Sequence, residues 1–195
     1  MKIGILISGR GSNMTALVDA MQSGEIPGAE AVVVISDKAD AGGLKKAIER
    51  GVETVVVERA GRTRVEHDAE IVSELEKRGV ELVCLAGYMR LLSPLFVEAF
   101  PGRIVNIHPS LLPAFPGLDA QRQAIEAGAE SSGCTVHFVD ELLDHGEIIL
   151  QKEVAVLEGD TPETLSARIL EQEHGLYVAA IKKLAAKFAE RSDKA

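Results

Sequence analysis

Tryptophan is absent from the 195 residues, and all aromatic residues together make up only 4% of the chain. The core must therefore be built from Val, Ile, Leu and Ala, which the overall hydrophobic content of 46% supplies. Cysteine is also scarce: Cys84 and Cys134 each lie inside an apolar run and are expected to be buried free thiols. The sequence contains no Cys-x-x-Cys pair and no Cys/His cluster, so no metal site is predicted.

Basic residues are outnumbered, with 21 Lys and Arg against 30 Asp and Glu, which gives a net charge of −9. An acidic chain repels phosphate backbones, so nucleic acid is excluded as an expected partner and a phosphate ligand needs a local binding device. Long apolar runs are missing too, because Arg10 ends the run Ile3–Ile7 and no segment approaches the ~20 residues of a membrane span. The sequence therefore predicts a cytoplasmic protein without a signal peptide and without a membrane partner.

Short apolar runs alternate with amphipathic stretches along the first half of the chain. Strands are expected at Ile3–Ile7, Glu30–Ser36, Thr54–Val57, Leu82–Ala86 and Ile104–Ile107, and helices at Asn13–Met21, Gly43–Arg50, Val65–Lys77 and Pro94–Phe100. Unbroken apolar strands that alternate with helices are typical of a parallel sheet covered on both faces. Such a sheet places its active site at the carboxyl ends of the strands.

The pattern changes after Ile107, where three prolines stiffen His108–Leu118 into a long loop. The later elements are expected at Gln121–Ala127 (helix), Cys134–Val139 and Ile148–Val156 (strands) and Pro162 to about Ala189 (helix), with Thr161 as N-cap and a break near His174 and Gly175. The fold prediction is an α/β, Rossmann-like domain with a mostly parallel twisted sheet of about seven strands.

A glycine-rich segment, Ser8-Gly9-Arg10-Gly11-Ser12-Asn13, joins the first strand to the first helix. Glycine permits positive φ and close backbone approach, and free amides at a helix N-terminus bind anions, so the segment can hold a phosphate. The alternative is a plain tight turn with a Ser or Asn cap. The dinucleotide pattern GxGxxG fails because Met14 replaces the third glycine, although Asp37 ends the second strand where a ribose-binding acid would lie.

Asn106 and His108 end the fifth strand, where positions two residues apart face the same way. An amide donor beside an imidazole suits a reaction that develops an oxyanion and moves protons. The alternative is a turn residue and a histidine packed under the prolines. Asp144 lies in the acidic loop Asp140–Glu147, where a carboxylate delivered against His108 would favour the imidazolium, but a solvated charged loop is equally consistent with the pattern.

The other histidines form no metal-ligand set with one another. His67 is expected on a helix surface, and His145 is expected to be exposed in a loop. His137 alternates with Val136 and Phe138, which predicts that it faces outward or into a polar pocket.

Several segments occur in the order found in one enzyme family. They are Ser8-Gly9-Arg10-Gly11-Ser12-Asn13, Leu85-Ala86-Gly87-Tyr88-Met89-Arg90, Asn106-Ile107-His108-Pro109-Ser110-Leu111-Leu112-Pro113, and Gly133-Cys134-Thr135-Val136-His137-Phe138-Val139 with Asp144 after it. Over nearly its whole length the chain resembles the folate-dependent formyltransferases. The Asn-x-His-Pro-Ser segment with its downstream Asp is shared by these enzymes and related hydrolases, whereas the glycine-rich loop points to the phosphoribosylglycinamide formyltransferase branch.

The resemblance implies an enzyme that transfers the formyl group of 10-formyltetrahydrofolate, its cosubstrate, to the amine of glycinamide ribonucleotide in purine biosynthesis. It implies direct attack through a tetrahedral intermediate, with Asn106, His108 and Asp144 as catalytic residues. The implied substrate-binding residues are Gly11, Ser12, Asn13 and Glu173, and the implied folate-binding residues are Arg64, Met89, Arg90, Leu91, Leu92, Val139 and Asp140. Residues 1–195 would form one domain, with a phosphate- and nucleotide-binding half (1–105) and a catalytic and folate-binding half (106–195). Its partners would be these small molecules, in a monomer or a homodimer.

Three positions depart from the family's pattern. Asp119 replaces a usual His, Leu170 replaces a polar residue found in some members, and His145-Gly146-Glu147 replaces Gly-Gly-Pro or Thr-Gly-Pro. The Glu in place of Pro is expected to loosen the loop that carries Asp144. None of these changes removes a catalytic group, so activity with altered affinity is expected.

Other functions compete with this interpretation. A hydrolase of the same fold, which releases formate from the folate, usually carries an additional N-terminal regulatory domain, and a transfer-RNA formyltransferase needs a basic C-terminal domain. A nucleotide-binding paralogue without catalysis would not need Asn106, His108 and Asp144 together. A nicotinamide oxidoreductase is disfavoured by the missing third glycine.

Overall fold

The computed structural model describes residues 1–192, in which strands and helices alternate as the sequence predicts. The strands are β1 (Lys2–Ile7), β2 (Glu30–Ser36), β3 (Thr54–Val56), β4 (Leu82–Leu85), β5 (Ile104–His108), β6 (Ser131–Phe138) and β7 (Ile148–Ala155). The helices are α1 (Ser12–Gln22), α2 (Gly42–Glu49), α3 (Arg64–Lys77), α4 (Pro94–Ala99), α5 (Ala120–Glu126) and α6 (Pro162–Ser192).

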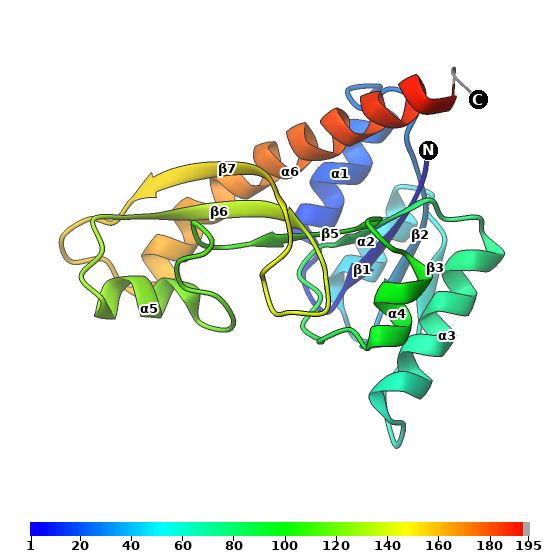
Figure 1. Cartoon of the computed structure of the whole chain (residues 1–195), viewed down its shortest axis with the longest axis horizontal. Helices are drawn as coiled ribbons and strands as arrows, with labels where there is room; N and C mark the ends of the chain where they lie inside the picture. The colour runs from blue at the N-terminus through cyan, green and yellow to red at the C-terminus, as the bar shows by residue number, and fades with distance from the viewer. Residues whose placement is uncertain (193–195) are drawn as a thin grey trace.

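All the strands join one seven-stranded sheet in the order β3-β2-β1-β4-β5-β6-β7 (Figure 1). The pairs from β3 to β5 are parallel, whereas β6 runs antiparallel to both β5 and β7. The predicted Rossmann-like, mostly parallel sheet is confirmed, and β6 and β7 form its antiparallel edge.

The strand order reverses beside β1, because the chain winds out through β2 and β3 and returns to β4 on the other side of β1. The loops that follow β1 and β4 therefore meet at one edge of the sheet. The Ser8 amide donates to the Gly87 carbonyl at 3.1 Å, and the Met89 amide donates to the Ser8 hydroxyl at 2.9 Å. Open α/β sheets bind ligands in the crevice that such a reversal creates.

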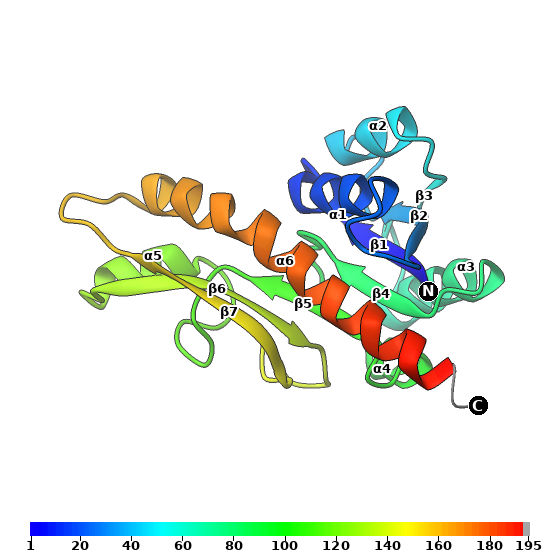
Figure 2. The ribbon, with the colours of Figure 1, turned by 90° about the horizontal axis from the view of Figure 1, so that it is seen from above.

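Helices cover both faces of the sheet, with α1, α2 and α6 on one side and α3 and α4 on the other (Figure 2). Successive residues of β1 alternate between the two cores, so that Ile5 and Ile7 pack under α1 whereas Leu6 faces α3. The central parallel strands β1 and β4 are thus buried on both faces, as their unbroken apolar sequences predict.

The strands β6 and β7 extend beyond the rest of the sheet with α5 and the first half of α6 beside them (Figure 1). Leu165 and Ile169 of α6 are fully buried there against β6 and β7. The expected break near His174 and Gly175 is wrong, since α6 is continuous over 31 residues. Burial on both sides of Gly175 stabilises the helix by more than the roughly 1 kcal/mol that a helical glycine costs.

The helix cap and the buried thiols that the sequence predicts are found in the structure, whereas the predicted exposure of His67 is not. Thr161 caps α6 as expected, because the Thr164 amide donates to its hydroxyl at 3.3 Å. Cys84 and Cys134 are buried free thiols, and burial raises the pKa of each to about 12. His67 was expected on the surface, but it is only 1% exposed and its Nε2 lies 2.7 Å from the Val57 carbonyl. No helix within residues 1–192 is long and apolar enough to cross a membrane.

Candidate active site

Asn106 and His108 lie on β5 at the edge of the sheet where the parallel strands end. His108 is 5% exposed. Its Nδ1 lies 3.3 Å from Asp144 Oδ2, and its Nε2 lies 2.9 Å from the carbonyl oxygen of Phe115. Both ring nitrogens therefore face oxygen acceptors, and only the imidazolium carries an N–H on each of them.

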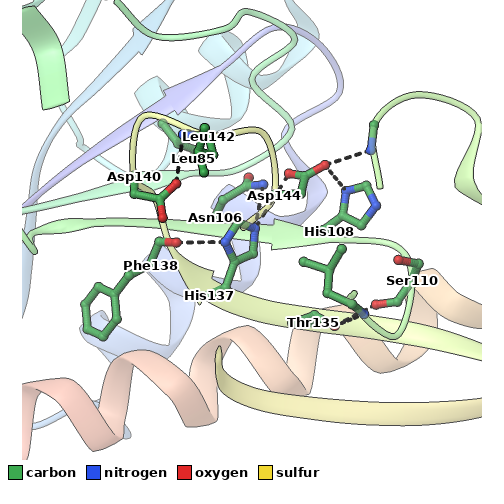
Figure 3. A network of polar contacts seen from close by, with 12 residues as sticks. Leu85, Asn106, His108, Ser110, Thr135, His137, Phe138, Asp140, Leu142 and Asp144 are labelled. Carbon is green, nitrogen blue, oxygen red and sulfur yellow. Dashed lines mark hydrogen bonds and ion pairs between the residues drawn. The ribbon is translucent and has the colours of Figure 1, made fainter. Parts of the chain in front are cut away.

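Asp144 is the acid of the 140–147 loop that reaches this centre (Figure 3). Its backbone is left-handed, with φ 49°, and its side chain is only 9% exposed. One carboxylate oxygen faces His108 and also accepts from the Gly117 amide at 2.8 Å. The other oxygen lies 3.7 Å from His137 Nε2, so the carboxylate links His108 to the loop at Gly117 and lies beside His137.

His137 is a member of this cluster that the sequence alone did not assign. It lies on β6 directly opposite Asn106, and the amide Nδ2 of Asn106 is 3.3 Å from His137 Nε2. His137 Nδ1 donates to its neighbour's carbonyl, Phe138, at 2.8 Å, which leaves Nε2 as the acceptor. Burial is the largest influence and lowers the pKa of His137, so the ring stays neutral and orients the Asn106 amide. The outward-facing alternative for His137 is wrong, and the polar pocket is confirmed.

The turn after β5 is held by side chains from the antiparallel strands. The Thr135 hydroxyl donates to the Ser110 carbonyl at 2.6 Å and accepts from the Leu112 amide at 3.1 Å. The Gln151 amide of β7 donates to the Leu112 carbonyl at 2.8 Å and to the Thr135 hydroxyl at 2.9 Å. These bonds fix the segment that leads from His108 to the loop at Phe115.

The glycine-rich loop opens α1 as the sequence predicts. Gly11 is the N-cap residue, with φ 66°, and no side chain caps the helix. The alternative prediction, a tight turn capped by a Ser or Asn side chain, is therefore wrong. Among residues 1–192 no side chain bonds to the first-turn backbone amides of α1, including those of Ser12 and Asn13, at the positive end of the helix dipole.

Asn13 and Glu173 meet although 160 residues separate them, because α6 packs along α1. The side-chain amide Nδ2 of Asn13 donates to Glu173 Oε2 at 2.7 Å. The side-chain oxygen Oδ1 of Asn13 is buried without a partner among the described residues. Burial raises the pKa of Glu173, and the Asn13 hydrogen bond and the charge of His108 oppose that shift. The charge of His108 therefore acts on Glu173, and Glu173 in turn is bonded to Asn13 at the start of α1.

The predicted folate-binding residues line two separate hollows. A hollow of about 180 Å³ is lined by Arg59, Arg64, His67, Asp68, Met89, Arg90 and Leu91. A hollow of about 540 Å³ is lined by Val97, Glu98, Pro101, Gly102, Phe138, Val139, Asp140, Glu141, Gly146 and Glu147. Leu92 lines neither and packs half-buried against the core. Met89 and Leu91 leave 68% and 54% of their surface exposed, which gives the first hollow an apolar rim beside its guanidinium groups.

Arg90 bonds to Asp37, with 2.8 Å between Nε and Oδ2, and Asp37 is buried. Asp37, which the sequence placed where a dinucleotide-binding protein would have its ribose-binding acid, is therefore explained by its ion pair with Arg90. Among residues 1–192 no group of three or more His, Cys, Asp or Glu side chains is arranged to hold a metal ion.

The departures at Asp119 and in His145-Gly146-Glu147 lie at the rim of this site. Asp119 is exposed, left-handed with φ 57°, and begins α5 without a side-chain cap bond. In the 140–147 loop, the Glu147 carbonyl accepts from the Phe138 amide at 2.9 Å, and Asp140 accepts from the Leu142 amide at 2.9 Å. The base of the loop is thus hydrogen-bonded with Glu at position 147.

Comparisons with known proteins agree with this geometry. A profile of the formyl transferase family matches residues 1–181. The structure of glycinamide ribonucleotide transformylase 1 from Symbiobacterium toebii superposes with a TM-score of 0.94 at 53% identity, covering 96% of this chain and 88% of that one. The structure of phosphoribosylglycinamide formyltransferase from Brucella melitensis gives a TM-score of 0.89 at 50% identity, with 95% of each chain covered.

Curated sequences give the same result. Phosphoribosylglycinamide formyltransferase of Escherichia coli (strain K12) is 45% identical over 182 residues, which are 93% of this chain and 85% of that protein. The trifunctional purine biosynthetic protein adenosine-3 of Drosophila pseudoobscura pseudoobscura is 48% identical over 186 residues, but this chain spans only 14% of its length. On these matches the chain belongs to the formyl transferase family, beside its phosphoribosylglycinamide formyltransferases.

Proposed function

We propose that this chain transfers the formyl group of 10-formyltetrahydrofolate to the amine of glycinamide ribonucleotide in de novo purine biosynthesis. The observation that carries the proposal is the junction of two sites. His108, Asn106 and Asp144 form a cluster that moves protons and binds an oxyanion. The glycine-rich segment Ser8 to Asn13, called the phosphate loop below, is connected to this cluster through Asn13 and Glu173. A phosphorylated amine can be held there with its reactive end at His108.

The substrate phosphate is held by the amides of Gly11, Ser12 and Asn13 at the start of α1. Glu173 and the unpartnered oxygen of Asn13 lie beyond them, where ribose hydroxyl groups can donate to both. This arrangement explains how a chain of net charge −9 binds a phosphate.

The formyl donor supplies the carbonyl carbon under attack and a nitrogen leaving group. Arg64, Met89, Arg90 and Leu91 line one hollow near the reacting centre, and Val139 and Asp140 line the other. Guanidinium groups beside an apolar rim fit a molecule with a flat ring system and an anionic tail. Leu92, the other implied folate contact, packs half-buried against the core and lines neither hollow.

Catalysis follows from the charges of the cluster. The substrate amine attacks the formyl carbon, a carbon–nitrogen bond forms, and the carbonyl oxygen becomes an oxyanion that Asn106 and the His108 imidazolium stabilise. Asp144 holds the imidazolium in place. As the bond to the donor nitrogen breaks and the carbonyl re-forms, the His108 imidazolium gives its proton to that nitrogen, and the resulting imidazole takes the proton that the attacking nitrogen loses. The Phe115 carbonyl bonds His108 Nε2 in this structure, so the donor nitrogen must replace it there.

Residues 1–195 act as one domain, with residues 1–105 supplying the phosphate loop and residues 106–195 supplying the reacting centre. Its two ligands are small molecules in the cytoplasm. The prediction of a monomer or a homodimer can be checked by measuring the molar mass in solution.

The test is to mix the protein with 10-formyltetrahydrofolate, with and without glycinamide ribonucleotide, and to follow deformylation of the folate by absorbance. Signal only with the nucleotide supports the transferase. Signal without the nucleotide favours a hydrolase, and no signal from the folded protein overturns both activities.

A further inference from the structure

Three consecutive carbonyl groups of the phosphate loop, those of Gly9, Arg10 and Gly11, are bonded to groups outside the loop. The Gly9 carbonyl accepts from the Gly43 amide at 2.9 Å, and the Gly11 carbonyl accepts from the amide and hydroxyl of Thr15 at 2.9 and 2.8 Å. Between them, the Arg10 carbonyl accepts from Lys46 Nζ at 2.9 Å. In a planar trans peptide the carbonyl and the following amide point in opposite directions. The bonds at Gly9 and Arg10, whose donors lie on α2, therefore turn the amides of Arg10 and Gly11 away from α2, and the bonds from Thr15 turn the Ser12 amide out of the N-terminal end of α1.

Two of these bonds are made by main-chain donors, which no substitution of a side chain removes. The bond at Arg10 is different, because its donor is the Lys46 ammonium on a separate helix. That peptide also carries the amide of Gly11, the first of the residues that we assign to the substrate phosphate.

The helix α2 is held firmly enough for Lys46 to act as a fixed donor. Arg50 at its C-terminal end pairs with Asp19 of α1, with 2.6 Å between Nε and Oδ1, and the Gln22 side chain donates to the Arg50 carbonyl at 2.7 Å. At the other end, a Cβ on Gly43 would come within 3.1 Å of Gly11 Cα, so the two backbones are in direct contact.

We propose that Lys46 is a positioning residue for the phosphate site. Its ammonium group fixes the peptide between Arg10 and Gly11 so that the Gly11 amide faces the anion, and it adds a positive charge behind the loop. The inference rests on the proposed function only in taking a phosphate monoester as the ligand of this loop. Lys46 itself does not touch the substrate.

The neighbouring lysine supplies a matched control. Lys45 has a side chain that is 85% exposed, and its only ion pair among the described residues is with Glu49 at 3.9 Å. Both lysines carry the same charge on the same short helix, but only Lys46 bonds to the loop.

The experiment measures ribose 5-phosphate binding by calorimetry for wild type, Lys46→Met, Lys46→Arg and Lys45→Met, without any formyl donor. We expect Lys46→Met to weaken the affinity about tenfold, which corresponds to roughly 1.4 kcal/mol. Lys46→Arg, which retains a charged donor, restores most of it, and Lys45→Met leaves it within about twofold. In the full reaction Lys46→Met raises KM for glycinamide ribonucleotide and leaves kcat and the KM for the folate nearly unchanged.

Equal loss of affinity in Lys46→Met and Lys45→Met would overturn the proposal, because general charge would then account for the effect. Unchanged affinity in Lys46→Met would overturn it as well. A thermal unfolding curve for each variant separates these results from loss of the fold, and Lys46→Gln, an uncharged donor of similar length, tests the same bond if Lys46→Met unfolds. Failure of the wild type to bind ribose 5-phosphate would instead overturn the phosphate site, and failure to transfer formyl groups with binding intact would overturn only the proposed function.

Discussion

The phosphate loop and the reacting centre are built in opposite ways. The loop is one run of consecutive residues, Ser8 to Asn13, whose shape follows from its glycines and from the helix that it begins. The reacting centre is assembled from β5, β6 and the 140–147 loop. Each of its residues is oriented by contacts with residues from another of these elements. The comparison teaches that the two should fail differently: damage to the loop should weaken substrate binding, whereas damage to the centre should slow the chemical step.

The largest effect is expected for His108→Ala, which removes the group that contacts Asp144 and, in the proposed function, gives a proton to the donor nitrogen. We expect kcat to fall by roughly a hundredfold or more, since loss of one such donor typically has that effect. The KM for glycinamide ribonucleotide should change little. Steady-state kinetics check this, with ribose 5-phosphate affinity as the control for an intact loop; a kcat within tenfold of wild type would contradict it.

The next effect is expected for Gly11→Ala in the loop. An added Cβ would lie 2.8 Å from Gly43 Cα, and a left-handed alanine costs about 1–2 kcal/mol in addition. We expect KM for the nucleotide to rise about tenfold or more with a smaller change in kcat. Gly24→Ala is the matched control, because Gly24 is also left-handed, with φ 80°, but has open space around it. If both variants bind the nucleotide equally well, the close contact with α2 has no role in binding.

A smaller effect is expected for Gln151→Leu, which removes the bonds from β7 to Leu112 and Thr135. The turn behind His108 loses about 1 kcal/mol of support, so we expect kcat to fall a few-fold and ribose 5-phosphate affinity to stay unchanged. Glu153→Gln, an exposed residue two positions further along β7, should match wild type. A loss of stability with an unaltered kcat would show that Gln151 supports the fold without positioning the centre.

The smallest effect is a dependence of stability on pH at Glu173, where the two regions meet. Because its folded-state pKa is raised by burial, its contribution to stability is complete below the ordinary pKa of glutamate and is lost as pH rises through the folded value. Glu173→Gln stays neutral, so its free energy of unfolding relative to wild type should increase between about pH 4 and about pH 8. Urea unfolding at both pH values measures this. Glu171→Gln, exposed on the same helix, should give a difference that does not vary with pH.

Features that depend on consecutive residues were predictable from sequence. The apolar runs predicted every strand end to within three residues, and the glycine-rich loop with its helix was placed correctly. The expected break at Gly175 failed because a local helix propensity was outweighed by burial along α6, which no local pattern records.

Features that depend on strand register were not predictable. His137 faces Asn106 only because β6 pairs antiparallel with β5 at that register, and alternation along β6 alone left its direction open. For the same reason the sequence could not select Asp144 among the acids of its loop. His67 was assigned to the surface because a polar residue on an amphipathic helix is usually solvated, whereas here the Val57 carbonyl provides its partner inside the core.

The left-handed backbone of Asp144 restricts which residues can replace it. Only glycine, asparagine and aspartate adopt this conformation readily, so a longer acid such as glutamate would distort the loop before it could deliver its charge. Position 144 thus requires both a carboxylate side chain and a left-handed backbone, and aspartate meets both requirements. Asn is the substitution that keeps the backbone and removes only the charge, and Asp144→Asn is therefore the variant in which electrostatics can be separated from loop shape.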